Sequence, residues 1–165
     1  LKKALHLKYK FQKLANKLNI KLKVIITKGN QPVGNGIGPN LEARDILYIL
    51  RRDKRGPKDL EKKSLYMSEL LLKMVGIKNP EKLAYFILNS GLAYKKMKQI
   101  IKAQGGNPNI NPDKLKIGKF KFNFKSTKSG VVKSINNELI SKVARAAGAP
   151  ANKSAGIYLD FHLTY

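Results

Sequence analysis

Positive charge constrains the folding of this chain more than any other feature of its sequence. Lysine and arginine account for 34 of the 165 residues and aspartate and glutamate for 10, so the formal net charge is +24 at pH 7. Self-repulsion on this scale opposes a compact state unless an anionic partner neutralises it. Because 42% of the residues are hydrophobic, the chain can still build a core. The composition therefore predicts a folded protein that lies against a polyanion, and RNA is the polyanion we expect.

Composition also excludes several kinds of protein. The chain has no cysteine, which removes disulfides, thiolate nucleophiles and zinc–thiolate sites. Its longest apolar runs are far too short to cross a bilayer, and its first residues lack the apolar centre of a signal peptide. We therefore expect a cytoplasmic protein.

The first two thirds of the chain predict a mostly helical unit. Residues 1–19 carry apolar side chains at spacings of three and four, which is typical of an amphipathic helix. The β-branched run 22–27 predicts one strand, and the Gly/Pro-rich stretch 28–39 predicts a loop whose amides could hold an anion. Further helices are expected at 40–52, 58–75, 80–89 and 91–104. The lone strand needs partners from upstream sequence, the second unit or another molecule.

A change of period indicates a second unit. Asn, Gly and Pro residues predict a linker at 106–112, which separates a first domain, 1–105, from a small α+β domain, 113–165. Over 116–125 polar residues alternate with phenylalanines, which predicts a strand with a wet lysine face. The buried face would consist of Phe120, Phe122 and Phe124. Further elements are expected as a strand at 130–135, a helix near 137–147 and a strand near 156–164. The fold class expected is α+β, mostly helical.

Three sequence strings carry a resemblance to a known family. They read TKGNQPVGNGIGPNLEARD over 27–45, AQGGNP over 103–108 and ARAAGAPANKSAGI over 144–157. In this order they resemble the nucleoside phosphorylase family of thymidine phosphorylase and the archaeal AMP phosphorylases, and the archaeal branch most. The matching part is the C-terminal portion of that family. The resemblance therefore implies that residues 1–105 are a remnant of an α/β phosphorylase domain, without the N-terminal catalytic half.

The resemblance implies an incomplete active site, because the family's phosphate-binding segment and base-holding residues lie upstream of this region. Glu42, Arg44 and Asp45 could act as an acid/base group, but their place at the start of a helix favours dipole and surface ion-pair roles. His6 and His162 are isolated, which favours structural or surface roles. We therefore expect no catalytic residue, no metal and no cofactor, and a pseudoenzyme when the chain is alone.

Three groups of basic residues are the candidate RNA contacts. Nine lysines precede the first acidic residue, Glu42. A second group surrounds the end of the helix at 40–52, where the helix dipole alone accounts for part of it. The third is the lysine face of 116–125 and its continuation, and such a face can follow phosphates without reading bases. The candidates are Lys3, Lys10, Lys13, Lys17, Lys21, Lys23, Lys28, Arg51, Arg52, Lys54, Arg55, Lys119, Lys121, Lys125, Lys128 and Lys133.

Three functions stay open at this point. The favoured one is a truncated phosphorylase-like protein reused to bind RNA, with rRNA and neighbouring ribosomal proteins as partners. The resemblance places Lys28, Asn107 and Asn152 where the family has Asp, or at the first position Asp or a neutral residue. Loss of negative charge at these positions suits a surface beside phosphates, and drift in a sequence no longer used for catalysis is the alternative. The alternative is a fragment or subunit of an active AMP or thymidine phosphorylase, completed by a separate N-terminal chain. The third, a membrane-surface protein, is disfavoured because the apolar face of 1–19 lacks tryptophan and suits a core.

Overall fold

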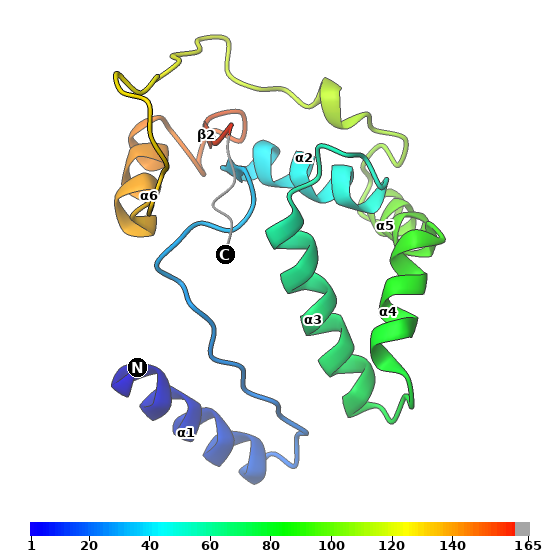
Figure 1. Cartoon of the computed structure of the whole chain (residues 1–165). Helices are drawn as coiled ribbons and strands as arrows, with labels where there is room; N and C mark the ends of the chain where they lie inside the picture. The colour runs from blue at the N-terminus through cyan, green and yellow to red at the C-terminus, as the bar shows by residue number, and fades with distance from the viewer. Residues whose placement is uncertain (161–165) are drawn as a thin grey trace.

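The computed structural model describes residues 1–160 of the chain (Figure 1). Over these residues the α-helices are α1 (Lys2–Lys17), α2 (Pro39–Leu50), α3 (Lys58–Met74), α4 (Pro80–Asn89), α5 (Leu92–Ala103) and α6 (Asn137–Ala146), with one 3-10 turn, η1 (Pro112–Lys114). Two short strands, β1 (Gly36–Ile37) and β2 (Ile157–Tyr158), pair antiparallel. The mostly helical α+β class is confirmed.

The helices form where the apolar periodicity predicts them, because residues that favour helix ends stand at the boundaries of the periodic segments. Pro39 stands in the first turn of α2, where its missing N–H would have had no helical partner. Gly91 takes a left-handed conformation, with φ of 79°, between α4 and α5. A glycine meets that requirement without steric cost, so the chain turns sharply there. The helices described in residues 1–160 include none that is long and apolar enough to span a membrane.

Three predicted strands are wrong. Residues 22–27, 116–125 and 130–135 contain no strand and pass along the outside of the molecule as irregular chain (Figure 1). No backbone hydrogen bond within residues 1–160 joins any of them to a neighbouring strand. A strand alone in water has no ladder to stabilise it, so β propensity without a partner does not produce one. The predicted strand at 156–164 forms only at β2, and its last four residues, with His162, lie outside the described residues.

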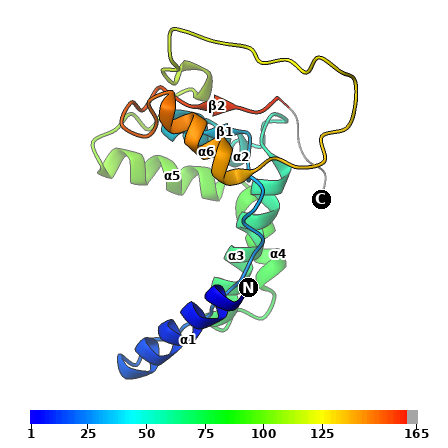
Figure 2. The ribbon, with the colours of Figure 1, turned by 90° about the vertical axis from the view of Figure 1, so that its left-hand side faces the viewer.

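The core gathers around α2. Its buried apolar residues are Leu41, Leu47, Tyr48 and Ile49. The helices α3 and α4 lie side by side, and α5 turns back towards α2, as both views show (Figures 1 and 2). The pairing of β1 with β2 then brings the far end of the chain onto the start of α2. Because β1 precedes residue 105 and β2 follows residue 113, the short sheet joins both predicted domains, and the domain division stays a prediction.

Helix α1 lies apart from this core, joined to it by the irregular residues that follow (Figures 1 and 2). Among its residues only Ala15 is buried. Leu7, Phe11 and Leu14 of its apolar face are each about half exposed, at 52%, 50% and 52%. The prediction that this face belongs to a core is therefore wrong within the described residues, and α1 presents an uncovered apolar face.

The contact between the two ends of the chain yields a test at Gly38. A Cβ at this position would lie 2.4 Å from the carbonyl oxygen of Ala155, and the φ of Gly38 is +132°. We expect Gly38→Ala to lower the free energy of unfolding by about 2–5 kcal/mol, because overlap and left-handed backbone both oppose a side chain. Chemical denaturation followed by circular dichroism measures it.

Gly130→Ala is the matched control, because a Cβ at Gly130 meets nothing within 4 Å. Its free energy of unfolding should stay within about 0.5 kcal/mol of the wild type. Equal losses in the two variants would contradict the close approach at Gly38.

Candidate functional site

A buried aspartate holds the glycine-rich loop from the inside. Asp45 of α2 is only 1% exposed. Its Oδ2 atom accepts hydrogen bonds from the backbone N–H groups of Asn35 and Gly36, each at 2.7 Å. The loop therefore wraps around the first turns of α2 and delivers β1 to its partner strand.

Two further carboxylates occupy neighbouring amides of the same loop. The N–H of Gly34 donates to Asp59 of α3 at 3.0 Å, and the N–H of Gly38 donates to Glu42 at 3.0 Å. Four successive or near-successive amides of the loop, those of Gly34, Asn35, Gly36 and Gly38, are thus already bonded to the chain's own carboxylates. The interpretation of the loop as an anion site is wrong at these four amides, which instead connect the loop to α2 and α3.

The environment of Asp45 disfavours its charge. Its Oδ1 atom is buried and makes no hydrogen bond within residues 1–160. Burial therefore raises the pKa of Asp45 above its usual range, although the N–H groups of Gly36 and Asn35 and the nearby Arg44 act in the opposite direction. The prediction that Asp45 is a surface residue is wrong.

The two residues predicted to accompany Asp45 have separate roles. Glu42 is exposed at the N-terminal end of α2, where its negative charge interacts favourably with the helix dipole, as expected. Arg44 lies over the ring of Tyr158, with its guanidinium carbon 4.5 Å from the ring centroid. Tyr158 also accepts a hydrogen bond from the side-chain amide of Asn35 at 3.3 Å. These contacts join the first family string to the residue that directly follows the third, and they do not form an acid/base group.

A second polar cluster connects η1 to α2. Asp113 of η1 accepts hydrogen bonds from the hydroxyl of Tyr48 and from Arg55, the latter at 2.7 Å. Arg55 also pairs with Asp53 at 2.7 Å and lies over the Tyr48 ring. Burial and the bond to Asp113 raise the pKa of Tyr48 to about 12, and Arg55 lowers the pKa of Asp53 to about 2. At neutral pH Arg55 and the two aspartates are charged and Tyr48 keeps its proton, and the cluster fixes the chain after α5 to the core.

The basic candidates near this cluster differ in how much charge they leave free. The charge of Arg55 is balanced by Asp53 and Asp113, and Arg52 pairs with Glu61 of α3 at 2.9 Å. Arg51 and Lys54 are exposed. The RNA role of all four stays a prediction, and Arg51 and Lys54 have the charge most available for it.

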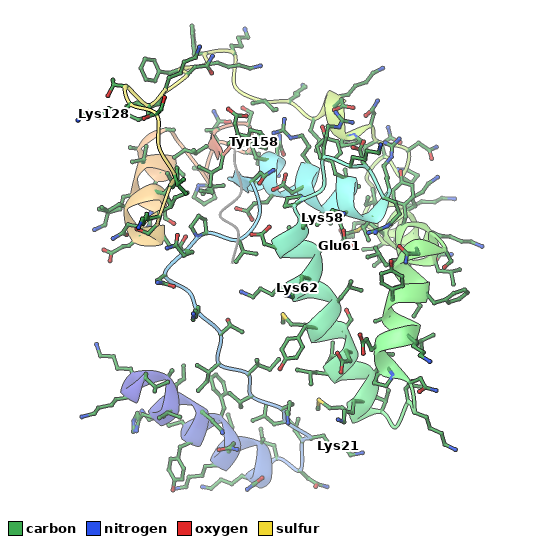
Figure 3. All side chains as sticks on the ribbon, in the orientation of Figure 1. Lys21, Lys58, Glu61, Lys62, Lys128 and Tyr158 are labelled. Carbon is green, nitrogen blue, oxygen red and sulfur yellow. The ribbon has the colours of Figure 1, made fainter. Side chains whose placement is uncertain are left out.

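The remaining lysine candidates are exposed but do not form one continuous surface. Figure 3 places Lys21 at the end of the molecule near α1 and Lys128 at the opposite end, above α6. The exposed residues of the first group are Lys3, Lys10, Lys13, Lys17, Lys21, Lys23 and Lys28. Those of the third are Lys119, Lys121, Lys125, Lys128 and Lys133. The structure therefore offers two separate basic surfaces, and RNA contact by either stays a prediction.

The most exposed aromatic residues were assigned to the core by the sequence pattern. Phe120, Phe122 and Phe124 are 98%, 90% and 89% exposed. The alternating pattern would have buried them only if the segment paired in a sheet, and within residues 1–160 it has no strand partner. The prediction of a buried phenylalanine face is wrong. The segment instead exposes both its phenylalanine rings and its lysine ammonium groups.

The rest of the described chain offers few other features of a site. A hollow of about 460 Å³ lies between α1 and the chain that follows it, lined by Tyr9, Gln12, Lys13, Ala15, Asn16, Ile20 and Leu22. Over residues 1–160 there is no group of three His, Asp or Glu side chains placed to hold a metal ion. His6 is exposed on α1.

Comparison with known proteins now gives these features a family context. No family model matches the chain. The AMP phosphorylase of Thermococcus kodakarensis is 45% identical over 152 residues, which cover 90% of this chain and 30% of the relative. The AMP phosphorylase of Methanococcus vannielii is 40% identical over 154 residues, which cover 92% of this chain and 30% of that relative. The AMP phosphorylase of Thermofilum pendens is 36% identical over 163 residues, which cover 99% of this chain and 32% of that relative.

The comparisons thus show a chain that is similar in sequence to the archaeal AMP phosphorylases. It is homologous to a portion of the archaeal AMP phosphorylases, and it spans about 30% of the length of the curated relatives it matches. The resemblance stated from the three strings is confirmed. The most buried polar contacts of the structure, those of Asp45 with Asn35 and Gly36, lie within the first of these strings.

The Asp45 contacts give a stability prediction. Asp45→Ala leaves the N–H groups of Asn35 and Gly36 buried without an acceptor, so we expect a loss of about 2–5 kcal/mol in the free energy of unfolding. Asp45→Asn keeps an acceptor oxygen and should lose less. Urea denaturation of the three proteins measures the difference, and equal losses would contradict the acceptor role.

The same pair of proteins tests the raised pKa. The folded chain holds the Asp45 proton more tightly than the unfolded chain, so the stability from this group is complete below the ordinary value of 3.8 and declines as the pH rises through the folded pKa. The wild type should therefore lose stability relative to Asp45→Asn over that window. A difference independent of pH would show that burial does not raise the pKa.

Proposed function

We propose that this chain is part of an AMP phosphorylase and supports phosphorolysis of AMP only together with the remaining portion of that enzyme. Phosphorolysis uses inorganic phosphate to break a glycosidic bond, releasing the free base and a phosphorylated sugar. The observation that carries the proposal is 45% identity over 90% of the chain to a relative more than three times as long. The family strings keep a folded arrangement around Asp45, as expected of a part that still supports an enzyme.

Uncovered apolar surface supports the need for a complementary portion. On α1, Leu7, Phe11 and Leu14 are about half exposed, and on α3 Met67 and Leu71 are 48% and 65% exposed. Exposed apolar surface of this kind is typical of a contact site, and it occurs here on both helices. Residues 22–27 carry β-branched side chains and no backbone hydrogen bonds within residues 1–160, so they can add to a sheet supplied from outside. A complementary phosphorylase portion meets both needs.

Reconstitution tests the proposal. The complementary portion is the part of the Thermococcus kodakarensis AMP phosphorylase that this chain does not match. We expect phosphate-dependent release of adenine from AMP when both polypeptides are mixed and none from either alone. Mixing should also bury the apolar face of α1, which a lowered binding of an apolar dye reports.

A double variant of the exposed face, Phe11→Asp with Leu14→Asp, is the matching test of assembly. It should abolish complex formation in size-exclusion chromatography, because two charges would be buried without partners. Lys62→Asp on α3 is the charge control and should still assemble. A stable complex that releases no adenine would remove the enzymatic proposal.

A second function, RNA binding, is favoured by a separate observation. The first 41 residues contain nine lysines and no acidic residue, and the seven of these lysines predicted to contact RNA are exposed. A basic surface without opposing charge attracts a phosphate backbone through counterion release. In this role the chain would be a cytoplasmic, ribosome-associated component in contact with rRNA and neighbouring ribosomal proteins.

Salt dependence separates specific lysines from general charge. We expect Lys10→Gln, Lys13→Gln and Lys17→Gln together to lower the slope of log affinity against log salt for a structured RNA by up to about 3, since each phosphate contact contributes about 0.9. The control is the change of three other exposed lysines, Lys62, Lys73 and Lys78, to glutamine. Equal changes in slope for both triple variants would contradict a site on α1.

A further inference from the structure

One stretch of the chain combines full exposure, aromatic rings and unopposed charge. Phe120, Phe122 and Phe124 expose 98%, 90% and 89% of their surface. The chain around them contains no acidic residue between Asp113 and Glu138, whereas it holds seven lysines over the same interval. We name residues 119–128 the Phe/Lys segment. Its uncovered rings need a partner, and its charge requires that partner to be anionic.

The backbone of the Phe/Lys segment sets the spacing of the rings. Residues 120–125 contain no helix or turn, and Figure 1 draws this stretch as an open path along the edge of the molecule. Extended chain rises about 3.3 Å per residue, so rings at every second position repeat about every 6.6 Å. Stacked bases of one nucleic-acid strand lie about 3.4 Å apart, and admitting a ring between two bases doubles this to about 6.8 Å. The two repeats agree.

From these observations we propose that the Phe/Lys segment binds single-stranded RNA, with Phe120, Phe122 and Phe124 stacking on successive bases and the flanking lysines contacting phosphates. This inference rests on the proposed RNA binding and gives it a second site, separate from α1. Stacking on aromatic rings tolerates any base, because every base has a π face. In extended chain the lysines at the intervening positions point away from the rings, so their long, flexible stems reach phosphates by bending around the edge of the backbone.

Other occupants fit the segment less well. Double-stranded RNA keeps its bases stacked inside the helix, where these rings have no access to them. A second copy of the segment pairing as a strand would set lysines opposite lysines, which is destabilising. A complementary protein strand would cover the rings but leave the charge without a counterpart. A single strand of RNA supplies stacking surface and negative charge together.

Titration of the full chain with a short fluorescent oligouridylate tests this inference. Changing all three phenylalanines to leucine keeps their apolar bulk and removes the aromatic faces. We expect this variant to bind the oligouridylate at least about tenfold more weakly, because stacking of a base on an aromatic ring contributes a substantial free energy at each position. Its salt slope should equal that of the wild type. Circular dichroism should also be unchanged, since the rings contact little of the protein.

The lysines provide the complementary variant. Lys119→Gln, Lys121→Gln and Lys125→Gln together should lower the salt slope by about 2, because each phosphate contact on a single strand contributes about 0.7. Unchanged affinity of the leucine variant would overturn the inference even where structured RNA still binds through α1. Equal binding of wild type to vesicles of anionic lipid, or self-association lost in the leucine variant, would also overturn it.

Discussion

The buried carboxylate of Asp45 is the contact on which the described fold depends most. It lies at the first turns of α2, accepts two amides of the glycine-rich loop and is nearly inaccessible to water. Through that loop it positions β1, and β1 in turn holds β2 and the third family string. Burial raises its pKa, so the chain keeps an acid whose charge is disfavoured at the centre of its polar network. A network of this kind loses more from one missing acceptor than a single hydrogen bond is worth.

Helices and strands were predicted with different success for a physical reason. A helix satisfies its own backbone, so periodicity and end signals such as Pro39 suffice to place α2 and its neighbours. A strand depends on a partner that lies elsewhere in the chain or outside it, and residues 22–27 and 116–125 have none within residues 1–160. The same reasoning explains the site. Chain composition revealed the lysines, whereas the burial of Asp45 and the exposure of Phe122 depend on which segments meet.

Two properties of the chain thus point to two kinds of partner. Its apolar faces on α1 and α3 fit a protein surface, and homology to AMP phosphorylases supports the remaining portion of that enzyme as the partner. Its exposed lysines around α1 and in the Phe/Lys segment, where no acidic residue opposes them, fit a phosphate backbone. Both kinds of surface occur on α1, so a protein bound to its apolar face would leave its lysine face open. A phosphorylase portion and RNA therefore do not exclude each other geometrically.

The antiparallel pair of β1 and β2 also governs when this chain can fold. The hydrogen bond from Asn35 to Tyr158 spans 123 positions, so the loop it closes contains most of the molecule. Closing so long a loop carries an entropy cost before any contact rewards it, and folds dominated by such pairings form slowly. During synthesis a nascent chain can complete α2, α3 and α4 early, while the glycine-rich loop waits until residues 157–158 have left the exit tunnel. The motif that most identifies this chain is therefore completed only after all the helices between β1 and β2 have been synthesised.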